Sequence, residues 1–141
     1  SASNVRKDFM HEMEMMQKHA DENPNDTTDL LKLGQMLYFS HKIKEAVPYY
    51  ERYLKAAPKN TDVMFDLALA YYDLQKTDQA LEITQRILRL EPKNSKAMYN
   101  LGAIYATQGN KAEAKKTWQK LLDTAPDSED AGRAKESMKQ L

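Results

Sequence analysis

Soft potential metal ligands gather in one short stretch near the N-terminus. The segment "MHEMEMM" places Met10, Met13, Met15 and Met16 around His11. Thioether and imidazole groups are suited to copper(I). Methionine more often fills irregular core or adaptable contact surface, so we interpret the segment as packing and predict no metal site.

The residues needed for other familiar reaction chemistries are missing. The chain has no cysteine nucleophile and no Gly-rich phosphate loop, and its histidines, His11, His19 and His41, are not closely paired. We therefore predict a protein that is not an enzyme and needs no cofactor.

Charge and hydropathy restrict the classes of partner. The 141 residues carry 21 basic and 21 acidic side chains, so the chain lacks the basic footprint of a nucleic-acid-binding protein. Apolar runs are only a few residues long, which predicts no direct membrane insertion. The expected partner is a protein or peptide.

A regular interval runs through the chain. Pro24, Pro58, Pro92 and Pro126 stand 34 residues apart, which is typical of a repeat architecture. On this period the same residue types recur in columns: Leu33, Leu67 and Leu101; Gly34, Ala68 and Gly102; Ala46, Ala80 and Ala114. Apolar residues recur at intervals of three and four, so each repeat is predicted to be two amphipathic helices.

Small residues and turn residues explain how the helices are joined. Gly34 and Ala46 lack bulk where two axes should cross, while Tyr50 fills the flank. Gly109 is predicted to end a helix and Asn110 to cap the next. Each "PKN" is predicted to end the second helix of a repeat. The next helix is then capped by Asn60 or Thr61 after the first copy and by Asn94 or Ser95 after the second. Pro48 lies inside a predicted helix as tolerated strain.

Both ends of the chain have helical spacing suited to covering a stack of repeats. An N-terminal stripe is predicted to cover the first repeat and consists of Val5, Phe9, Met13, Met16 and Ala20. Residues 129–141 place Ala131, Ala134, Met138 and Leu141 on one side of a C-terminal lid.

These columns resemble the tetratricopeptide repeat (TPR) family. The matching positions are Leu30, Leu33, Gly34, Leu37, Ala46, Tyr50, Tyr53 and Pro58, with two further copies at intervals of 34. The resemblance implies an all-α, right-handed superhelix of three helix-turn-helix repeats. The predicted organisation is a capping helix at 1–26, repeats at 27–60, 61–94 and 95–128, and a capping helix at 129–141.

The resemblance further implies a concave groove, lined by the first helix of each repeat, that binds a peptide or helix of a partner. The groove residues are Lys32, Gln35, Tyr38, Phe39, Asp62, Phe65, Asp66, Leu69, Tyr72, Asp73, Lys96, Tyr99 and Asn100. Aromatic rings would supply contact area and short polar groups would set the register of the bound chain. As an alternative, the charged residues bridge neighbouring helices, as Lys32 with Asp66 or Asp62 with Lys96.

Within the family, the sequence is similar to bacterial repeat proteins of cytochrome c maturation. The similarity lies in "QKHADENPNDTTDLLKLG" and in "AKKTWQKLLDTAPDSEDAGRAKESMKQL". Those proteins act in the periplasm and hold the C-terminal tail of an apocytochrome or of a partner subunit. The resemblance therefore favours a scaffold in the periplasm, as a mature or truncated form, over a cytoplasmic one. The alternative function is a self-assembling scaffold, a homo-oligomer whose N-terminal helix docks in a neighbour's groove.

Overall fold

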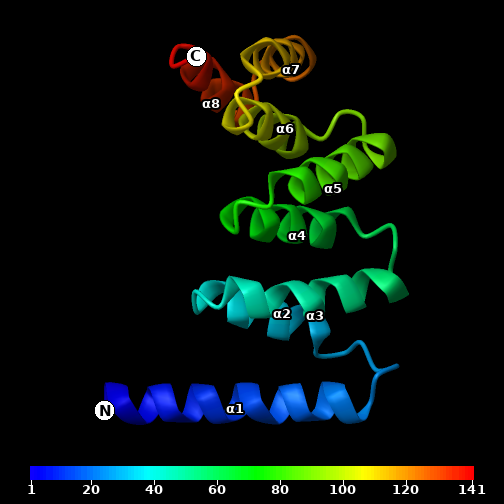
Figure 1. Ribbon diagram of the computed structural model, residues 1–141, viewed down its shortest axis with the longest axis vertical. Coiled ribbons are helices and arrows are strands. Elements are labelled where there is room, and N and C mark those ends of the chain that lie inside the picture. Colours follow the sequence, from blue (N-terminus) through cyan, green and yellow to red (C-terminus); the bar gives the residue numbers. More distant parts are fainter. The chain divides into compact units, whose positions relative to one another are not determined.

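The computed structural model describes residues 1–141, and every regular element in it is an α-helix (Figure 1). The helices are α1 (Ala2–Glu22), α2 (Leu30–Phe39), α3 (Ile43–Ala56), α4 (Thr61–Asp73), α5 (Thr77–Leu90), α6 (Ser95–Thr107), α7 (Lys111–Thr124) and α8 (Glu129–Met138). The predicted all-α fold class is confirmed. None of the helices combines the length and the apolar character that crossing a membrane requires.

The chain forms two compact units, Ser1–Val63 and Met64–Leu141, and the boundary between them in the sequence falls within α4. In the first unit α2 packs against both α1 and α3. In the second, α6 packs against α5 and α7, and α8 packs against both α6 and α7. The apolar surfaces of these helices are therefore buried mainly against their neighbours.

Helix starts follow the predicted capping chemistry. Asn94 Oδ1 accepts a hydrogen bond from the Ala97 amide at 3.0 Å, and Asn110 Oδ1 accepts one from the Glu113 amide at 3.3 Å. Asn60 Oδ1 accepts from the Val63 amide at 3.2 Å. These bonds confirm the predicted asparagine caps, each of which satisfies an amide that the first helical turn leaves unpaired.

The turn inside each helix pair contains one residue in the left-handed backbone region. Gly109 has φ of 79°, and the positions 34 and 68 residues earlier, Gln75 and His41, have φ of 62° and 60°. Glycine adopts this conformation without steric cost, whereas other residues lose about 1–2 kcal/mol. Of the three, only Gly109 was predicted as a turn residue from the sequence, because glycine is the residue type that adopts positive φ most readily.

Aromatic residues on the second helix pack directly on glycines of the first. A Cβ added to Gly34 would lie 2.8 Å from the Tyr50 ring, and one added to Gly102 would lie 2.2 Å from Trp118 Nε1. Tyr50 therefore covers Gly34 itself. In the second repeat the same columns hold Ala68 and Thr84, both buried. The smaller the residue on the first helix of a repeat, the larger the side chain that packs on it from the second helix.

Thr84 leaves a buried hydroxyl without a hydrogen bond. Because such a group loses its hydration without compensation, we expect Thr84→Val to raise the free energy of unfolding by about 1–2 kcal/mol. Urea unfolding followed by circular dichroism measures this change. Thr84→Ser is the matched control, since it keeps the hydroxyl and loses a methyl group, and it should lower stability. A loss of stability in Thr84→Val would show that the hydroxyl has a partner.

The N-terminal helix covers the first unit with only part of its predicted stripe. Met13 and Ala20 are buried, and Arg52 Nη2 on α3 donates to the Ala20 carbonyl at 2.8 Å. The prediction for Val5 is wrong, because 68% of its surface is exposed. The first turns of α1 leave their apolar side open because α1, at 21 residues, is much longer than the 10-residue α2 against which it packs.

Asp26 organises the connection between α1 and α2. Its carboxylate accepts hydrogen bonds from the hydroxyl and the amide of Thr28 and lies 3.1 Å from His19 Nε2. The Thr28 bonds, and then His19, lower the pKa of Asp26 from its ordinary 3.8 to about 2. His19 therefore has a structural partner in this turn.

Candidate functional site

The second unit contains a pocket of about 260 Å³ formed by three helices. Its walls come from α4, α6 and α8, and its lining residues are Ala68, Leu69, Tyr72, Asp73, Tyr99, Asn100, Ala103, Ile104 and Arg133. Aliphatic and aromatic surface predominates, with an amide, a carboxylate and a guanidinium among it. This combination is typical of a site that buries an apolar group and orients it by a few polar contacts.

Helical spacing brings several predicted groove residues into this pocket: Leu69, Tyr72, Asp73, Tyr99 and Asn100. On α4, residues 69, 72 and 73 stand three and four apart and therefore share a face. Residues 99, 100, 103 and 104 do the same on α6. Five of the residues that the TPR resemblance placed in a groove therefore line one cavity.

Tyr99 forms part of the pocket wall and is held from several directions. Its ring stacks on Trp118 with centroids 5.8 Å apart, and the Arg133 guanidinium carbon lies 4.0 Å from its centroid. Its hydroxyl is 3.0 Å from Ser137 Oγ. Trp118 Nε1 also donates to the Tyr99 carbonyl at 3.0 Å. The ring is therefore a fixed surface, because moving it would break contacts with both α7 and α8.

The Tyr72 side chain of α4 is held by a hydrogen bond to α6. Its hydroxyl lies 2.8 Å from Thr107 Oγ1, and Thr107 Oγ1 in turn donates to the Ala103 carbonyl at 3.0 Å. This bond sets the position of the Tyr72 ring at the pocket edge. Replacing Tyr72 would therefore alter helix contacts as well as the pocket.

Asn100 differs from these two residues because its side-chain amide makes no hydrogen bond within the protein. The residue is half-buried and lines the pocket. An amide offers both donors and an acceptor, which matches the alternating groups of a peptide backbone. Asn100 is therefore the pocket residue whose polar group is most available to a ligand.

Arg133 was missed by the sequence analysis, which treated 129–141 only as a lid. The repeat interval contained the signal: Arg133 follows Phe65 and Tyr99 in the same column, one period later. Arg133 Nη1 lies 3.6 Å from Asp130 Oδ1, and its side chain is 56% exposed. Since Asp73 also lines the pocket, the pocket carries one charge of each sign.

Helix α2 contains the predicted residues Lys32, Gln35, Tyr38 and Phe39. Lys32 Nζ is 3.5 Å from Glu12 Oε1 on α1, so this charge bridges two helices. Phe39 is 78% exposed and meets the Tyr38 ring edge-on, with centroids 5.5 Å apart. Gln35 is exposed.

The remaining predicted residues do not line the α4–α6–α8 pocket. Lys96 Nζ lies 5.9 Å from the centroid of the Phe65 ring, a cation–π arrangement between α6 and α4. Asp62 is exposed in the first turn of α4, and Asp66 is half-buried on the same helix.

No cluster of three or more His, Asp or Glu side chains that could hold a metal ion is present. The methionines of "MHEMEMM" point in different directions from α1, since Met13 is buried and Met15 is 54% exposed. These side chains do not converge on one site.

Comparison with known families gives a match over most of the chain. Residues 10–132 match the family described as "Cytochrome c-type biogenesis protein H TPR domain". No curated protein sequence matches the chain.

Solved structures with the same fold are numerous. The crystal structure of YrrB, titled "a TPR protein with an unusual peptide-binding site", superimposes with a TM-score of 0.80 at 24% identity, covering 94% of this chain and 68% of that one. The crystal structure of MamA gives 0.76 at 21% identity, covering 96% and 82%. A tetratricopeptide repeat protein from Parabacteroides merdae gives 0.78 at 23% identity, covering 92% and 52%. At these identities the likeness establishes the fold, which is that of TPR proteins.

Proposed function

Because the chain belongs to the TPR-domain family of cytochrome c-type biogenesis protein H, we propose that it is a non-catalytic scaffold that binds a peptide segment of a partner protein in the α4–α6–α8 pocket. The observation that carries the proposal is the Asn100 amide, half-buried in an aromatic and aliphatic pocket without a hydrogen bond in the protein. YrrB, a protein of the same fold that is described as having an unusual peptide-binding site, supports this class of ligand.

The pocket suits an extended segment with one buried apolar side chain. Leu69, Ala103 and Ile104 provide aliphatic contact, while the fixed Tyr99 ring provides a rigid wall. A rigid wall lowers the entropy lost when the ligand binds, since its side chain is already ordered. The Asn100 amide then hydrogen-bonds the ligand backbone and sets its register.

Charged residues at the pocket give the bound segment a direction. The Arg133 guanidinium lies over the Tyr99 ring with Nη1 near Asp130, and its exposed side chain has further N–H donors for a carboxylate of the ligand. Asp73 favours a cationic group on the ligand. A segment with opposite charges on either side of its apolar anchor would match the signs of both residues in one orientation only.

Replacing Asn100 tests the site. We expect Asn100→Ala to weaken binding about tenfold, because one or two hydrogen bonds to the ligand are lost, while thermal unfolding stays nearly unchanged. Fluorescence anisotropy with labelled peptides measures the affinity. Asn25→Ala, at an exposed turn, is the matched control and should bind normally. Unchanged affinity in Asn100→Ala would place the ligand elsewhere.

We further propose that the partner belongs to cytochrome c maturation, as the family assignment suggests. The peptides for the binding assay should therefore tile the c-type apocytochromes and the maturation subunits of the host genome. Binding of C-terminal tail peptides from this set would support the role. Selective binding of unrelated peptides at the same Asn100-dependent site would support the scaffold and reject the role in maturation.

Self-assembly through α1 is the second candidate function. It is favoured by Val5 and Met15, which expose 68% and 54% of their surfaces on this helix. Against it, α1 already packs on α2 of its own unit. Light scattering across a concentration series, with and without residues 1–22, separates the two functions.

A further inference from the structure

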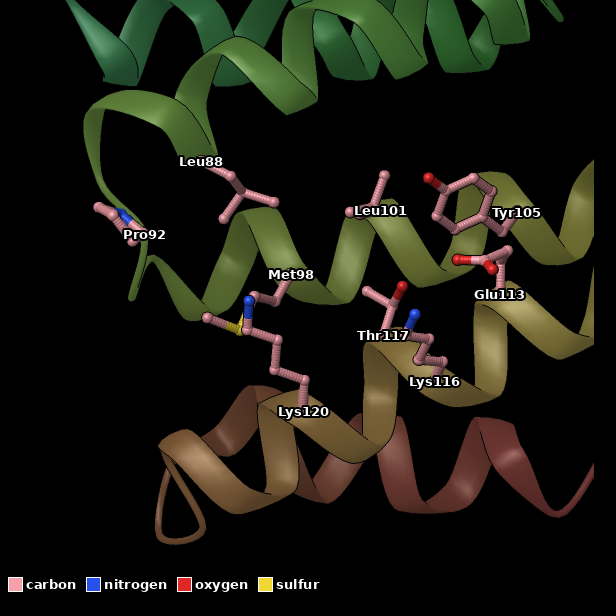
Figure 2. A pocket seen from close by; sticks show the side chains of 9 residues that line it. All are labelled: Leu88, Pro92, Met98, Leu101, Tyr105, Glu113, Lys116, Thr117 and Lys120. Carbon is pink, nitrogen blue, oxygen red and sulfur yellow. The ribbon is translucent and has the colours of Figure 1, made fainter.

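A second pocket opens between α5, α6 and α7, away from the proposed peptide site. Its volume is about 340 Å³, and it is lined by Leu88, Pro92, Met98, Leu101, Tyr105, Glu113, Lys116, Thr117 and Lys120 (Figure 2). No lining residue is shared with the α4–α6–α8 pocket. We call it the outer pocket.

The two pockets use different faces of α6. Met98, Leu101 and Tyr105 recur at intervals of three and four and face the outer pocket. Residues 99, 100, 103 and 104 face the other pocket. With about 100° of rotation per residue, the two sets lie on opposite sides of the helix axis. A ligand in one pocket therefore leaves the other accessible.

The outer pocket is open because one residue is too small to fill it. Thr117 occupies the column in which the preceding repeat has Ile83, and Ile83 is 6% exposed. Leu101 also departs from its column, since it is only half-buried whereas Leu33 and Leu67 are 0% and 3% exposed. In Figure 2, Thr117 of α7 points toward α6, and the Leu101 side chain points to the side of α6 on which Leu88 of α5 lies. The third repeat thus leaves apolar surface uncovered that its columns would bury.

Basic side chains border this apolar surface. Lys116 and Lys120 are both exposed, stand one helical turn apart on α7, and form no ion pair within the protein. Glu113, one turn earlier, is the only acidic residue that lines the pocket, and it lies at the Tyr105 end (Figure 2). A bound group near Thr117 and Lys120 would therefore meet positive charge, which favours carboxylates.

We propose that the outer pocket is a second protein-binding site, which takes an acidic segment of a partner protein through one bulky aliphatic side chain. The aliphatic group packs on Leu88, Leu101 and the Thr117 methyl. Flanking carboxylates pair with Lys116 and Lys120. The volume lies near the lower end of the range of about 300–1,000 Å³ for ligand pockets, so it holds one or two side chains rather than a whole helix.

Thr117→Ile tests the proposal, because it introduces the residue type that the chain itself uses at Ile83. The probe is a synthetic hexapeptide, two leucines flanked on each side by two glutamates, added to the full chain labelled at its methyl groups. We expect shifts of the Leu88, Leu101 and Thr117 methyl signals by nuclear magnetic resonance. In Thr117→Ile the affinity should fall about tenfold or more, since the cavity is filled.

Charge variants keep the proposal testable if Thr117→Ile disturbs the fold. The double variant Lys116→Glu and Lys120→Glu should lower the affinity for the acidic peptide about tenfold. Added salt should lower the affinity of the unchanged chain, because it screens the ion pairs with the lysines. Lys115→Glu on the same helix does not touch the pocket and is the control, with normal binding expected. Asn100→Ala should bind this peptide normally, which separates the outer pocket from the site of the proposed function.

Three results would overturn the proposal. The first is equal binding of the same hexapeptide with lysines in place of the glutamates. The second is unchanged affinity in both Thr117→Ile and the double lysine variant. The third is a dimer of the unmodified chain that dissociates on Thr117→Ile, which would make a second copy of this chain the occupant.

Discussion

Gly102→Ala should lower the free energy of unfolding of the second unit by about 1–3 kcal/mol. The new Cβ would lie 2.2 Å from Trp118 Nε1 and 2.5 Å from its Cδ1, far inside contact distance. The indole cannot easily withdraw, because it is 3% exposed, donates to the Tyr99 carbonyl and stacks on the Tyr99 ring. The overpacking exceeds the gain of about 1 kcal/mol that alanine brings to a helix.

Gly132→Ala is the matched control, since Gly132 is also helical but nothing lies within 4 Å of its added Cβ. This variant should raise the free energy of unfolding by about 0.5–1 kcal/mol. Trp118 is the only tryptophan, so its fluorescence in urea reports unfolding of the unit that contains both glycines. Similar shifts of the same sign in the two variants would contradict the packing argument.

Local sequence rules predicted most of the secondary structure because helix ends depend on neighbouring residues. The asparagine caps at Asn60, Asn94 and Asn110 satisfy amides three residues ahead, so the short-range pattern contains the needed information. Val5 shows the limit of this reasoning. Its spacing places Val5 on the apolar stripe of α1. Burial also requires a neighbouring helix that extends as far as Val5, and α2 is too short to reach it.

The candidate site was predicted in part for a similar reason. The resemblance to TPR proteins placed thirteen residues along a groove, of which Leu69, Tyr72, Asp73, Tyr99 and Asn100 line the pocket. The 34-residue repeat period does not distinguish an aromatic side chain that is available to a ligand from one that packs within the protein. Tyr99 lies in the same column as Phe65, but only the contacts of Trp118, Arg133 and Ser137 reveal that it is fixed.

Two residues that differ in type from the equivalent residues of the preceding repeat shape the two pockets. Thr117 in the column of Ile83 opens the outer pocket, and Arg133 in the column of Tyr99 brings a cation to the peptide site. Both departures are visible in the sequence once the columns are aligned. Their consequences are not, because they depend on which neighbouring side chains fail to fill the space.

The effect of Gly102→Ala on the free energy of unfolding should change sign when Trp118 is also replaced by alanine. Trp118→Ala alone removes a buried indole and should cost about 3–5 kcal/mol. With the ring gone, the Cβ at residue 102 meets no collision, so alanine should now stabilise by up to about 1 kcal/mol through helix propensity. The protein already contains a version of this double variant, since the second repeat pairs Ala68 with the smaller Thr84.

A double-mutant cycle by urea unfolding, followed by circular dichroism because the tryptophan is removed, measures the coupling between residues 102 and 118. Residues in direct contact are expected to be strongly non-additive, and a coupling of about 2–3 kcal/mol would follow from the clash. If Gly102→Ala destabilises equally in both backgrounds, its cost arises elsewhere in α6. In that case the glycine is not needed for the close approach of Trp118, and the pairing of small with large residues across each repeat has no energetic basis.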